Sequence, residues 1–407
     1  MSSFMGQMLN YRFLSIDRFD GENLGSFSFF LSHCHTDHMV GLTHEAFKYK
    51  LKCQPDVKLF TSEVTKCLLL ADEKFLFLLP NIEVLLIEVP KLLRIKTKSI
   101  VEELTVTLLP AGHCPGSVMF LFEGAEGTML YTGDFRLSHS SASRMPCLKN
   151  KVIDHIYVDT TFCIEEAWYI PPRELCVKNL LKIVQQWIVR GNQYVVRLNM
   201  SAKYGYEYLI EELHKSFGEK IYCSRAKNYD CLPNIASILT TDPTCSHIFV
   251  CYKTEILGNQ WKASKMDVAD MFKNVQWLTI NLSTMYFTNC EEAHVVEVQT
   301  NKQCYRLCFS FHSSLSEICS FLRQIKPTHI HANVLPSINE TFYSVEERLR
   351  RLCTNQTHSM QQSYQPLGSI QSSNNQCVQV VQRSNSLDVL HSNKGFSFAQ
   401  RKRKNHS

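Results

Sequence analysis

Four potential metal ligands lie within six consecutive residues of this 407-residue chain, directly after the apolar stretch Phe27–Leu31. The segment reads H-C-H-T-D-H and supplies His33, His35, Asp37 and His38. Imidazole and carboxylate groups suit Zn²⁺ and similar borderline ions, and four ligands so close together can serve two ions at once. The alternative is a histidine-rich surface loop that binds no metal. We interpret the segment as a metal-binding loop, which restricts the fold to one that brings further ligands to it.

Three further candidate ligands lie where other apolar segments end. His113, Asp134 and His312 close the segments L-T-V-T-L-L-P-A-G-H, T-M-L-Y-T-G-D and C-Y-R-L-C-F-S-F-H. Strand ends at the edge of a sheet can direct loops toward a common site. A single histidine or aspartate in such a position is more often a hydrogen-bonded structural residue or a turn residue. The three together, each at a strand end, favour metal binding.

The number of ligands predicts two ions that share a carboxylate. The expected sets are His33, His35 and His113 for one ion, Asp37, His38 and His312 for the other, and Asp134 as the bridge. Two ions about 3.5–4 Å apart can share a water, lower its pKa and hold both the attacking and the leaving oxygen of a phosphodiester. This arrangement predicts hydrolysis without a side-chain nucleophile. Asp37 is the best-placed group to accept a proton from the water.

Several motifs resemble those of the metallo-β-lactamase/β-CASP DNA nucleases, the DNA cross-link repair family. The motifs are S-I-D-R-F-D at 15–20, F-L-S-H-C-H-T-D-H at 30–38, L-L-P-A-G-H-C-P-G-S-V-M-F-L-F at 108–122, L-Y-T-G-D-F-R at 130–136 and D-T-T-F at 159–162. Within the family, the opening M-S-S-F-M-G-Q-M and the segments Y-G-Y-E-Y-L and C-F-S-F-H-S-S resemble Artemis-like members more than Apollo-like ones. The resemblance extends from Met1 to about Arg351. It implies an α/β fold, a metallo-β-lactamase αββα sandwich with an inserted α/β β-CASP cap domain.

The resemblance implies a role for each candidate residue. The seven proposed ligands fall on the family's metal-binding motifs: His33, His35, Asp37, His38, His113, Asp134 and His312. Two further carboxylates fall on motifs that act through these ligands. Asp17 is expected to brace the histidine loop, and Asp159 to orient a ligand histidine. From the residues alone, Asp17 and Asp159 could equally be capping or turn residues.

The resemblance also bears on the type of nucleic acid. The third cap motif holds valine in DNA-directed members and histidine in RNA-directed ones. Alignment on N-V-x-P, with Asn333 and Pro336 setting the register, places Val334 there. His329 and His331 lie just upstream, and a shifted register would bring a histidine to this position. We therefore expect DNA as the substrate and retain RNA processing as the alternative.

Ser313, beside His312, and Lys203 in the cap are candidate phosphate contacts. Their alternatives are an ordinary turn residue and a solvated basic surface. The family's Artemis-like members carry a structural zinc site in the cap. Tyr222 and Phe249 stand here where histidines of that site would be expected, so we do not predict it.

The domain organisation expected from composition and periodicity has four parts. They are a first part of the metallo-β-lactamase domain at 1–158, a cap domain at 159–300, a return segment at 301–353 and a disordered tail at 354–407, rich in Gln, Ser and Asn. The expected elements include strands at Ile82–Val89, Leu104–Leu109, Val118–Phe122, Ile153–Val158 and Tyr194–Leu198 and a helix at Arg173–Arg190. Metal ligands on both sides of the cap mean that the return segment must complete the first domain.

Composition agrees with a soluble intracellular enzyme. The 17 cysteines include no C-x-x-C pair, and the opening residues lack a secretory signal, so reduced thiols are expected. No uncharged apolar run approaches the length of a membrane span, and we expect no membrane association. The net charge of +5 is too small to indicate nucleic acid by itself. The basic run Arg401–Lys404 resembles a nuclear import signal, and we expect a nuclear protein.

We therefore predict a metal-dependent DNA nuclease with Zn²⁺ as its cofactor and Mg²⁺ or Mn²⁺ as other working ions. The resemblance implies 5′-to-3′ exonuclease and structure-specific endonuclease activity at DNA ends, hairpins and overhangs. It implies roles in double-strand-break repair by non-homologous end joining, in V(D)J-type recombination or in cross-link repair. It also suggests DNA-dependent protein kinase and DNA ligase IV as partners, although the short tail argues against both. A non-catalytic repair scaffold is the remaining alternative, which retention of all seven ligands disfavours.

Overall fold

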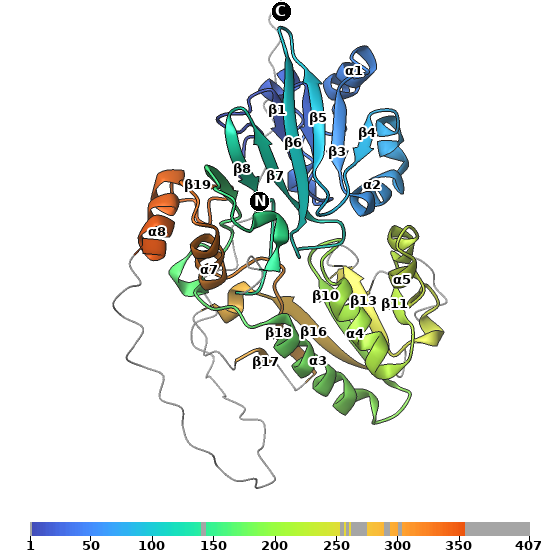
Figure 1. Ribbon diagram of the computed structural model, residues 1–407. Coiled ribbons are helices and arrows are strands. Elements are labelled where there is room, and N and C mark those ends of the chain that lie inside the picture. The colour runs from blue at the N-terminus through green and yellow to red at the C-terminus, as the bar shows by residue number, and fades with distance from the viewer. Residues whose placement is uncertain are drawn as a thin grey trace, which may run out of the picture. The chain divides into compact units, whose positions relative to one another are not determined.

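The computed structural model in Figure 1 describes residues 2–139, 144–252, 256–257, 260–261, 275–288, 294–299 and 303–354. The expected disordered tail, apart from its first residue, and the basic run Arg401–Lys404 lie outside this part of the chain. No helix within it is long and apolar enough to cross a membrane.

Two sheets pack face to face in the first part of the fold (Figure 1). The four-stranded sheet is parallel and contains, in spatial order, β1 (Leu14–Ile16), β2 (Ser28–Phe30), β3 (Lys58–Thr61) and β4 (Ile82–Val84). The six-stranded sheet is mixed and has the order β19 (His329–Ala332), β9 (His155–Val158), β8 (Gly127–Tyr131), β7 (Val118–Gly124), β6 (Val101–Pro110) and β5 (Lys91–Lys96). Because β19 pairs with β9, a strand that follows the cap in the sequence forms one edge of this sheet.

Phenylalanine rings fill the space between the two sheets. The Phe30 ring of β2 contacts Phe60 of β3 and Phe120 and Phe122 of β7, with centroid separations of 5.0–5.3 Å. Successive side chains of a strand point to opposite faces. Phe29 therefore faces outward, and its ring lies 4.9 Å from that of Phe47 in a covering helix. Both faces of the sheet are buried, which explains why the consecutive residues Phe29, Phe30 and Leu31 are all apolar.

Helices cover the outer face of each sheet. The helices α1 (Glu45–Cys53) and α2 (Glu63–Leu70) pack on the four-stranded sheet. The helices α7 (Leu315–Ile325) and α8 (Phe342–Thr354) pack on the six-stranded sheet. Ser314 begins α7 with a capping box that it forms with Glu317. The layer order is helix, sheet, sheet, helix, and the α/β sandwich expected from the resemblance is confirmed.

The cap is built on a seven-stranded sheet. Its order is β12 (Leu239–Thr240), β11 (Ile221–Cys223), β13 (Ile248–Tyr252), β10 (Tyr194–Met200), β16 (Gln276–Ser283), β18 (Cys304–Cys308) and β17 (Val296–Gln299), of which only β17 is antiparallel to its neighbour. The other α-helices of the described residues are α3 (Arg173–Ile188), α4 (Glu207–Phe217) and α5 (Pro233–Ala236), and β14 (Ile256–Leu257) and β15 (Gln260–Trp261) form a short hairpin. Strand β18 pairs with β16, so the strand that precedes His312 belongs to the cap sheet although we placed it in the return segment. The domain boundaries stay a proposal.

Truncation of Phe30 tests the core between the sheets. We expect Phe30→Ala to lower the free energy of unfolding by about 3–5 kcal/mol, because the cavity would lie among three aromatic rings that cannot all close on it. Urea unfolding followed by circular dichroism measures the change. Phe30→Leu, which keeps most of the buried apolar surface, should cost clearly less. A loss below about 1 kcal/mol for Phe30→Ala would contradict the tight packing described here.

Candidate metal centre

The Asp17 carboxylate fixes the histidine loop. Strands β1 and β2 are parallel neighbours, so Asp17, directly after β1, lies beside the loop that follows β2. Its carboxylate accepts hydrogen bonds from the Ser32 amide at 2.7 Å, the Ser32 hydroxyl at 2.6 Å, the Tyr131 hydroxyl at 2.9 Å and His38 Nδ1 at 2.8 Å. Asp17 is 3% exposed and has a φ of +53°, a left-handed conformation that aspartate tolerates better than most residues. The side chain therefore holds the loop and one ring of the cluster together.

Asp159 plays the same part for the histidine that follows the cap. It lies directly after β9, and its Oδ2 accepts from His312 Nδ1 at 2.9 Å and from the Phe135 amide at 3.2 Å. Its Oδ1 accepts from the amide and the hydroxyl of Thr161 at 2.9 and 2.6 Å. These contacts fix the carboxylate, and the fixed carboxylate orients the His312 ring.

The turn that carries His113 is held by backbone geometry. Ser117 Oγ accepts hydrogen bonds from the amides of His113 and Cys114, each at 3.1 Å. Gly112 has a φ of +67°, and a Cβ there would lie 2.6 Å from the carbonyl oxygen of Arg136. Glycine is required in this turn because no other residue fits both the conformation and the space.

Two rings show which of their nitrogens face the cluster. His35 Nε2 lies 3.1 Å from the Tyr204 carbonyl oxygen, and His113 Nδ1 lies 2.8 Å from that of Phe311. A carbonyl oxygen only accepts, so these two nitrogens carry protons and the other nitrogen of each neutral ring carries a lone pair. The two lone-pair nitrogens, His35 Nδ1 and His113 Nε2, face each other at 2.9 Å. Two lone pairs cannot form a hydrogen bond with each other, but a cation between the two nitrogens can accept both.

The other rings point toward a single buried carboxylate. The Nε2 atoms of His33 and His38 are buried and make no hydrogen bond. Four Nε2 atoms surround the carboxylate of Asp134, at 3.2 Å for His38, 3.5 Å for His113, 3.7 Å for His33 and 4.0 Å for His312. Imidazole nitrogens converging on a carboxylate form the donor set that Zn²⁺ and similar ions take. The residues therefore fit bound metal ions.

The electrostatics of the cluster favour positive charge beside Asp134. Burial lowers the pKa of three rings, those of His33, His35 and His113. Burial also opposes a charge on His38 and His312, but Asp134 for His38 and Asp159 for His312 outweigh it and raise the pKa of both rings. The pKa of Asp134 is held well below its usual range, because these two rings overcome the effect of its burial. Metal ions would compete with protons for this position, so metal affinity should weaken as pH falls.

The structure groups the predicted ligands in a partly different way from the expected sets. The first expected set is brought together, with Cys114 beside it, as one cluster of His33, His35, His113 and Cys114. The other two clusters share Asp134, one with His33 and His38 and the other with His113 and His312. Asp37 belongs to neither: its Oδ2 lies 4.0 Å from His38 Nε2 and accepts a hydrogen bond from the Ser2 amide at 2.9 Å. The assignment of ligands to individual ions stays a proposal.

Two cysteines beside the histidines are thiols that pack in the loop. Burial raises the pKa of Cys34 to about 12 and that of Cys114 well above its usual range. The thiolate form that binds metal is therefore disfavoured for both.

A cavity of about 100 Å³ opens beside the cluster. Its lining combines four predicted site residues with two neighbours and Val334: Ser2, His35, Asp37, Asp134, Thr161, His312 and Val334. His331 does not line it, because its Nε2 lies 2.8 Å from His155 Nδ1 on β9. Ser313 is 1% exposed, and its hydroxyl donates to the Phe135 carbonyl at 3.1 Å, away from the cavity lining. Lys203 is exposed in the cap, with its Nζ 4.9 Å from the centroid of the Tyr204 ring.

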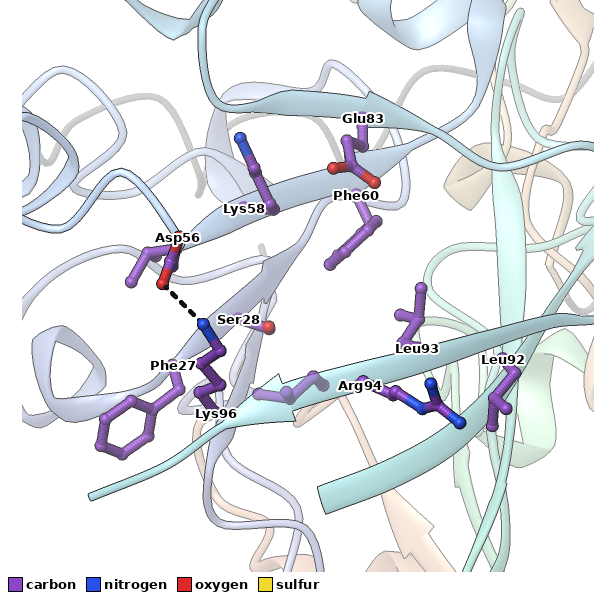
Figure 2. A pocket seen from close by; sticks show the side chains of 12 residues that line it. Phe27, Ser28, Asp56, Lys58, Phe60, Glu83, Leu92, Leu93, Arg94 and Lys96 are labelled. Carbon is purple, nitrogen blue, oxygen red and sulfur yellow. Dashed lines mark hydrogen bonds and ion pairs between the residues drawn. The ribbon is translucent and has the colours of Figure 1, made fainter. Parts of the chain in front are cut away.

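A larger cavity of about 300 Å³ lies elsewhere, between β2–β4 and β5 (Figure 2). Its charged residues have both signs, and Lys96 Nζ lies 3.5 Å from Asp56 Oδ2 across it. It contains none of the metal-capable clusters found in the described part of the chain. We therefore assign the function to the histidine cluster.

Sequence reasoning named Asp17 and Asp159 among the outer partners of the rings and did not identify the others. Tyr131 lies in the quoted segment L-Y-T-G-D-F-R, and its hydroxyl could have been suspected from that position. The carbonyl oxygens of Tyr204 and Phe311 carry no sequence signal, because every residue has one. Only the fold shows that they hold His35 and His113.

A helix-sheet-sheet-helix sandwich with a histidine and aspartate cluster at its strand ends defines a protein of the metallo-β-lactamase class. The profile of the DNA repair metallo-beta-lactamase family matches residues 233–338. Over 91% of its length the chain is 42% identical to Protein artemis from Mus musculus and from Homo sapiens, of which it spans 53% and 54%. It is 31% identical to 5′ exonuclease Apollo from Gallus gallus over 78% of its length, and it spans 60% of that protein. The chain belongs to the Artemis-like family of DNA repair metallo-β-lactamase proteins.

Substitution of Asp17, the carboxylate that braces the histidine loop, tests the metal centre without removing any proposed ligand. Asp17→Asn should weaken zinc affinity by about 10–100-fold, because an amide cannot accept all four hydrogen bonds that hold the loop and His38. Competition against a chromophoric chelator measures the affinity. Asp20→Asn is the matched control, since the Asp20 carboxylate pairs with the partly exposed Arg18 at 2.6 Å. Equal zinc affinity in the two variants would show that Asp17 does not act on the metal centre.

Proposed function

We propose that this protein is a metal-dependent nuclease that hydrolyses phosphodiester bonds in DNA. The observation that carries the proposal is the set of four Nε2 atoms directed at the buried Asp134, beside a cavity that opens on Asp37. Family membership supports it, because one relative is by name a 5′ exonuclease and the family profile is one of DNA repair. Zn²⁺ is the ion we expect, with Mg²⁺ or Mn²⁺ as alternatives in activity.

The residues of the cluster divide into those that would hold metal and those that hold the ligands. His33, His35, His38, His113, His312 and Asp134 would bind the ions. Bound metal ions would activate a water and stabilise charge on the leaving oxygen. Asp17 and Asp159 keep the Nδ1 atoms of their rings bonded, so that the Nε2 atoms face the site.

Asp37 is the group we propose to accept a proton from the attacking water. Its side chain is 29% exposed and lines the cavity, whereas Asp134 is 9% exposed and is surrounded by rings. The Ser2 amide donates to Asp37 Oδ2 and helps to fix the carboxylate beside the cavity. Geometry thus gives Asp37 access to a substrate that Asp134 lacks.

Basic and aromatic side chains in the cap support a nucleic-acid substrate. Lys203 and Arg225 follow β10 and β11, and Arg225 lies 4.5 Å from the Tyr252 ring centroid at the end of β13. Partial burial lowers the pKa of Lys203, and the charge of Arg225 adds to this effect while that of Asp72 opposes it. Positive charge interleaved with aromatic rings suits a strand with phosphates and exposed bases. Lys215 differs, because Glu212 lies 2.8 Å from its Nζ and neutralises it.

DNA is the favoured nucleic acid because Val334 lines the cavity and His331, the histidine that a shifted register would bring to this position, does not. We propose, from the resemblance, that this position distinguishes DNA from RNA. The cellular roles implied by the resemblance are also proposals: nuclear action at DNA ends, hairpins and overhangs in end joining. Binding to DNA-dependent protein kinase or to DNA ligase IV is a proposal of the same kind. An RNA-processing nuclease is the second candidate.

Cleavage assays on matched substrates test the activity. Wild-type protein should cut end-labelled single-stranded and hairpin DNA, and a chelator should abolish cutting. His312→Ala should lower the rate by about 100-fold or more, because loss of a ligand costs more than loss of an outer partner. His329→Ala, which removes an exposed histidine outside the cluster, should cut as wild type does. Cleavage of RNA alone would move the assignment to RNA processing, and metal-loaded protein that cuts nothing would indicate a scaffold.

The role of Val334 has its own test. Val334→His should lower the ratio of DNA to RNA cleavage, since an imidazole would enter the cavity of about 100 Å³ that valine borders. The values of kcat and KM on DNA and RNA of one sequence, measured with zinc affinity as a control, separate this from damage to the metal centre. Val334→Ala should leave the preference for DNA in place. An unchanged ratio in Val334→His would remove Val334 as a determinant of substrate type.

A further inference from the structure

Two arginines connect the cap to the turns that carry metal ligands. Arg136 follows Asp134 by two residues and is 8% exposed. Arg173 is the first residue of α3 in the cap. Neither residue is one of the proposed ligands or their direct partners, yet both point their guanidinium groups at backbone carbonyls next to ligand histidines.

One guanidinium group bridges two ligand turns. Arg173 Nη2 donates to the Gly112 carbonyl at 2.8 Å, and Arg173 Nε donates to the Ser310 carbonyl at 3.0 Å. Gly112 directly precedes His113, and Ser310 lies two residues before His312. The planar guanidinium has donors in fixed directions, so these two bonds set the distance between the two turns.

Arg136, from the segment that carries Asp134, contacts the same Ser310 carbonyl as Arg173 and the residues just before α3. Its Nη1 donates to the Ser310 carbonyl at 2.8 Å, and its Nη2 donates to the carbonyls of Pro171 and Ile170 at 2.9 and 3.3 Å. Its Nε lies 3.7 Å from Glu317 Oε2. Arg136 therefore joins the Asp134 segment to the start of α3, while both arginines bind the same Ser310 oxygen.

Ser310 transmits this restraint to a ligand. Its hydroxyl accepts from the His312 amide at 3.1 Å and donates to the His312 carbonyl at 2.9 Å. On the other side, the absence of a side chain at Gly112 lets its backbone approach Arg136 closely. The rings of His113 and His312 lie 4.6 Å apart between centroids and form one metal-capable cluster with Asp134. Any change at the arginines thus reaches the spacing of these ligands.

The arrangement is costly for stability alone. Burial, and then the charge of Arg136, lower the pKa of Arg173 to about 10, so two cations remain close together at neutral pH. Glu317 lies beside Arg136, and the charges of Glu174, Glu317 and Glu207 partly offset the effect on Arg173, whose own hydrogen bonds go to carbonyl oxygens. Burying like charges together is unfavourable unless their hydrogen bonds are satisfied. Hydrogen bonds of Arg136 and Arg173 are made to the carbonyls of Ser310 and Gly112, in the turns that carry His312 and His113.

We propose that Arg173 is a positioning residue of the metal centre, which fixes the spacing of His113 and His312 through Gly112 and Ser310. The proposal rests on the proposed function only in taking the cluster to bind metal. On this proposal, a residue in the first turn of a cap helix affects how tightly one ion is bound. That ion is the one we place between His113, Asp134 and His312.

Zinc affinity in Arg173 variants tests this role. We would titrate Zn²⁺ against a chromophoric chelator in wild type, Arg173→Met, Arg173→Lys and Arg190→Met, and record the thermal unfolding of each metal-free protein. Arg173→Met should bind one ion about 10–100-fold more weakly, because outer partners of ligands typically contribute this much. Arg173→Lys should fall between, since an ammonium group lacks the planar fork. Arg190→Met is the control: it removes a guanidinium group that stacks on Trp187, 4.6 Å from the ring centroid, far along the chain from the ligand turns.

The outcomes separate the possible roles. Wild-type affinity for both ions in Arg173→Met would overturn the proposal, even with a lower melting temperature, because a merely structural residue would change only the stability. If Arg173→Met does not fold, weaker binding of one ion by folded Arg173→Lys still supports the proposal and unchanged binding overturns it. A wild-type protein that binds no Zn²⁺ would overturn the metal centre and the proposed function together, which is a distinct result. DNA cleavage by Arg173→Met should recover at high metal concentration, as expected of a residue that acts through metal affinity.

Discussion

Five imidazole rings form one cluster, in which four surround the buried carboxylate of Asp134 and the fifth, His35, faces His113. The rest of the structure holds these rings in place. Rings this close are stable together only when the outer nitrogen of each has a partner. The partners are two carboxylates, one hydroxyl and two backbone carbonyls: Asp17, Asp159, Ser32, Tyr204 and Phe311. Each partner follows or adjoins a strand end, so the sheets determine the cluster. The cation-binding capacity of the site follows from these outer contacts as much as from the ligands themselves.

The outer contacts also explain why the fold needs the cap. Tyr204 follows β10 and Phe311 follows β18, both strands of the seven-stranded sheet, and their carbonyls hold His35 and His113 of the first domain. In open α/β sheets, ligands bind beyond the carboxyl ends of the strands. The cap sheet directs those ends at the cluster, and Arg173 at the start of α3 adds a further connection. A sandwich without the cap would retain most ligands and lose the groups that orient two of them.

The sequence allowed the layers and the ligand positions to be predicted, because both leave local patterns. The strand expected at Leu104–Leu109 lies within β6, and the helix expected at Arg173–Arg190 is α3 with its end two residues earlier. The strand expected at Ile82–Val89 stops at Val84, because only its first residues pair with β3 before the chain crosses to the other sheet. Apolar character continues past that point, so hydropathy gave no sign of where pairing ends. The place of β18 in the cap sheet was missed for a similar reason: pairing partners far apart in the chain leave no local signal.

Residues of both the cap and the sandwich build the metal centre. Metal binding is therefore coupled to the contacts between these two parts. Ions that bind the oriented rings stabilise the state in which Tyr204, Phe311 and Ser310 are in place, by an amount set by ion concentration relative to affinity. By the same linkage, anything that loosens the cap weakens metal binding. Asp17 comes from the sandwich, and its hydrogen bonds are made within it, so it does not depend on the cap in this way. The ion held by His113 and His312 should therefore be the one more sensitive to the cap, since both of these ligands are tied to the segment that returns from it.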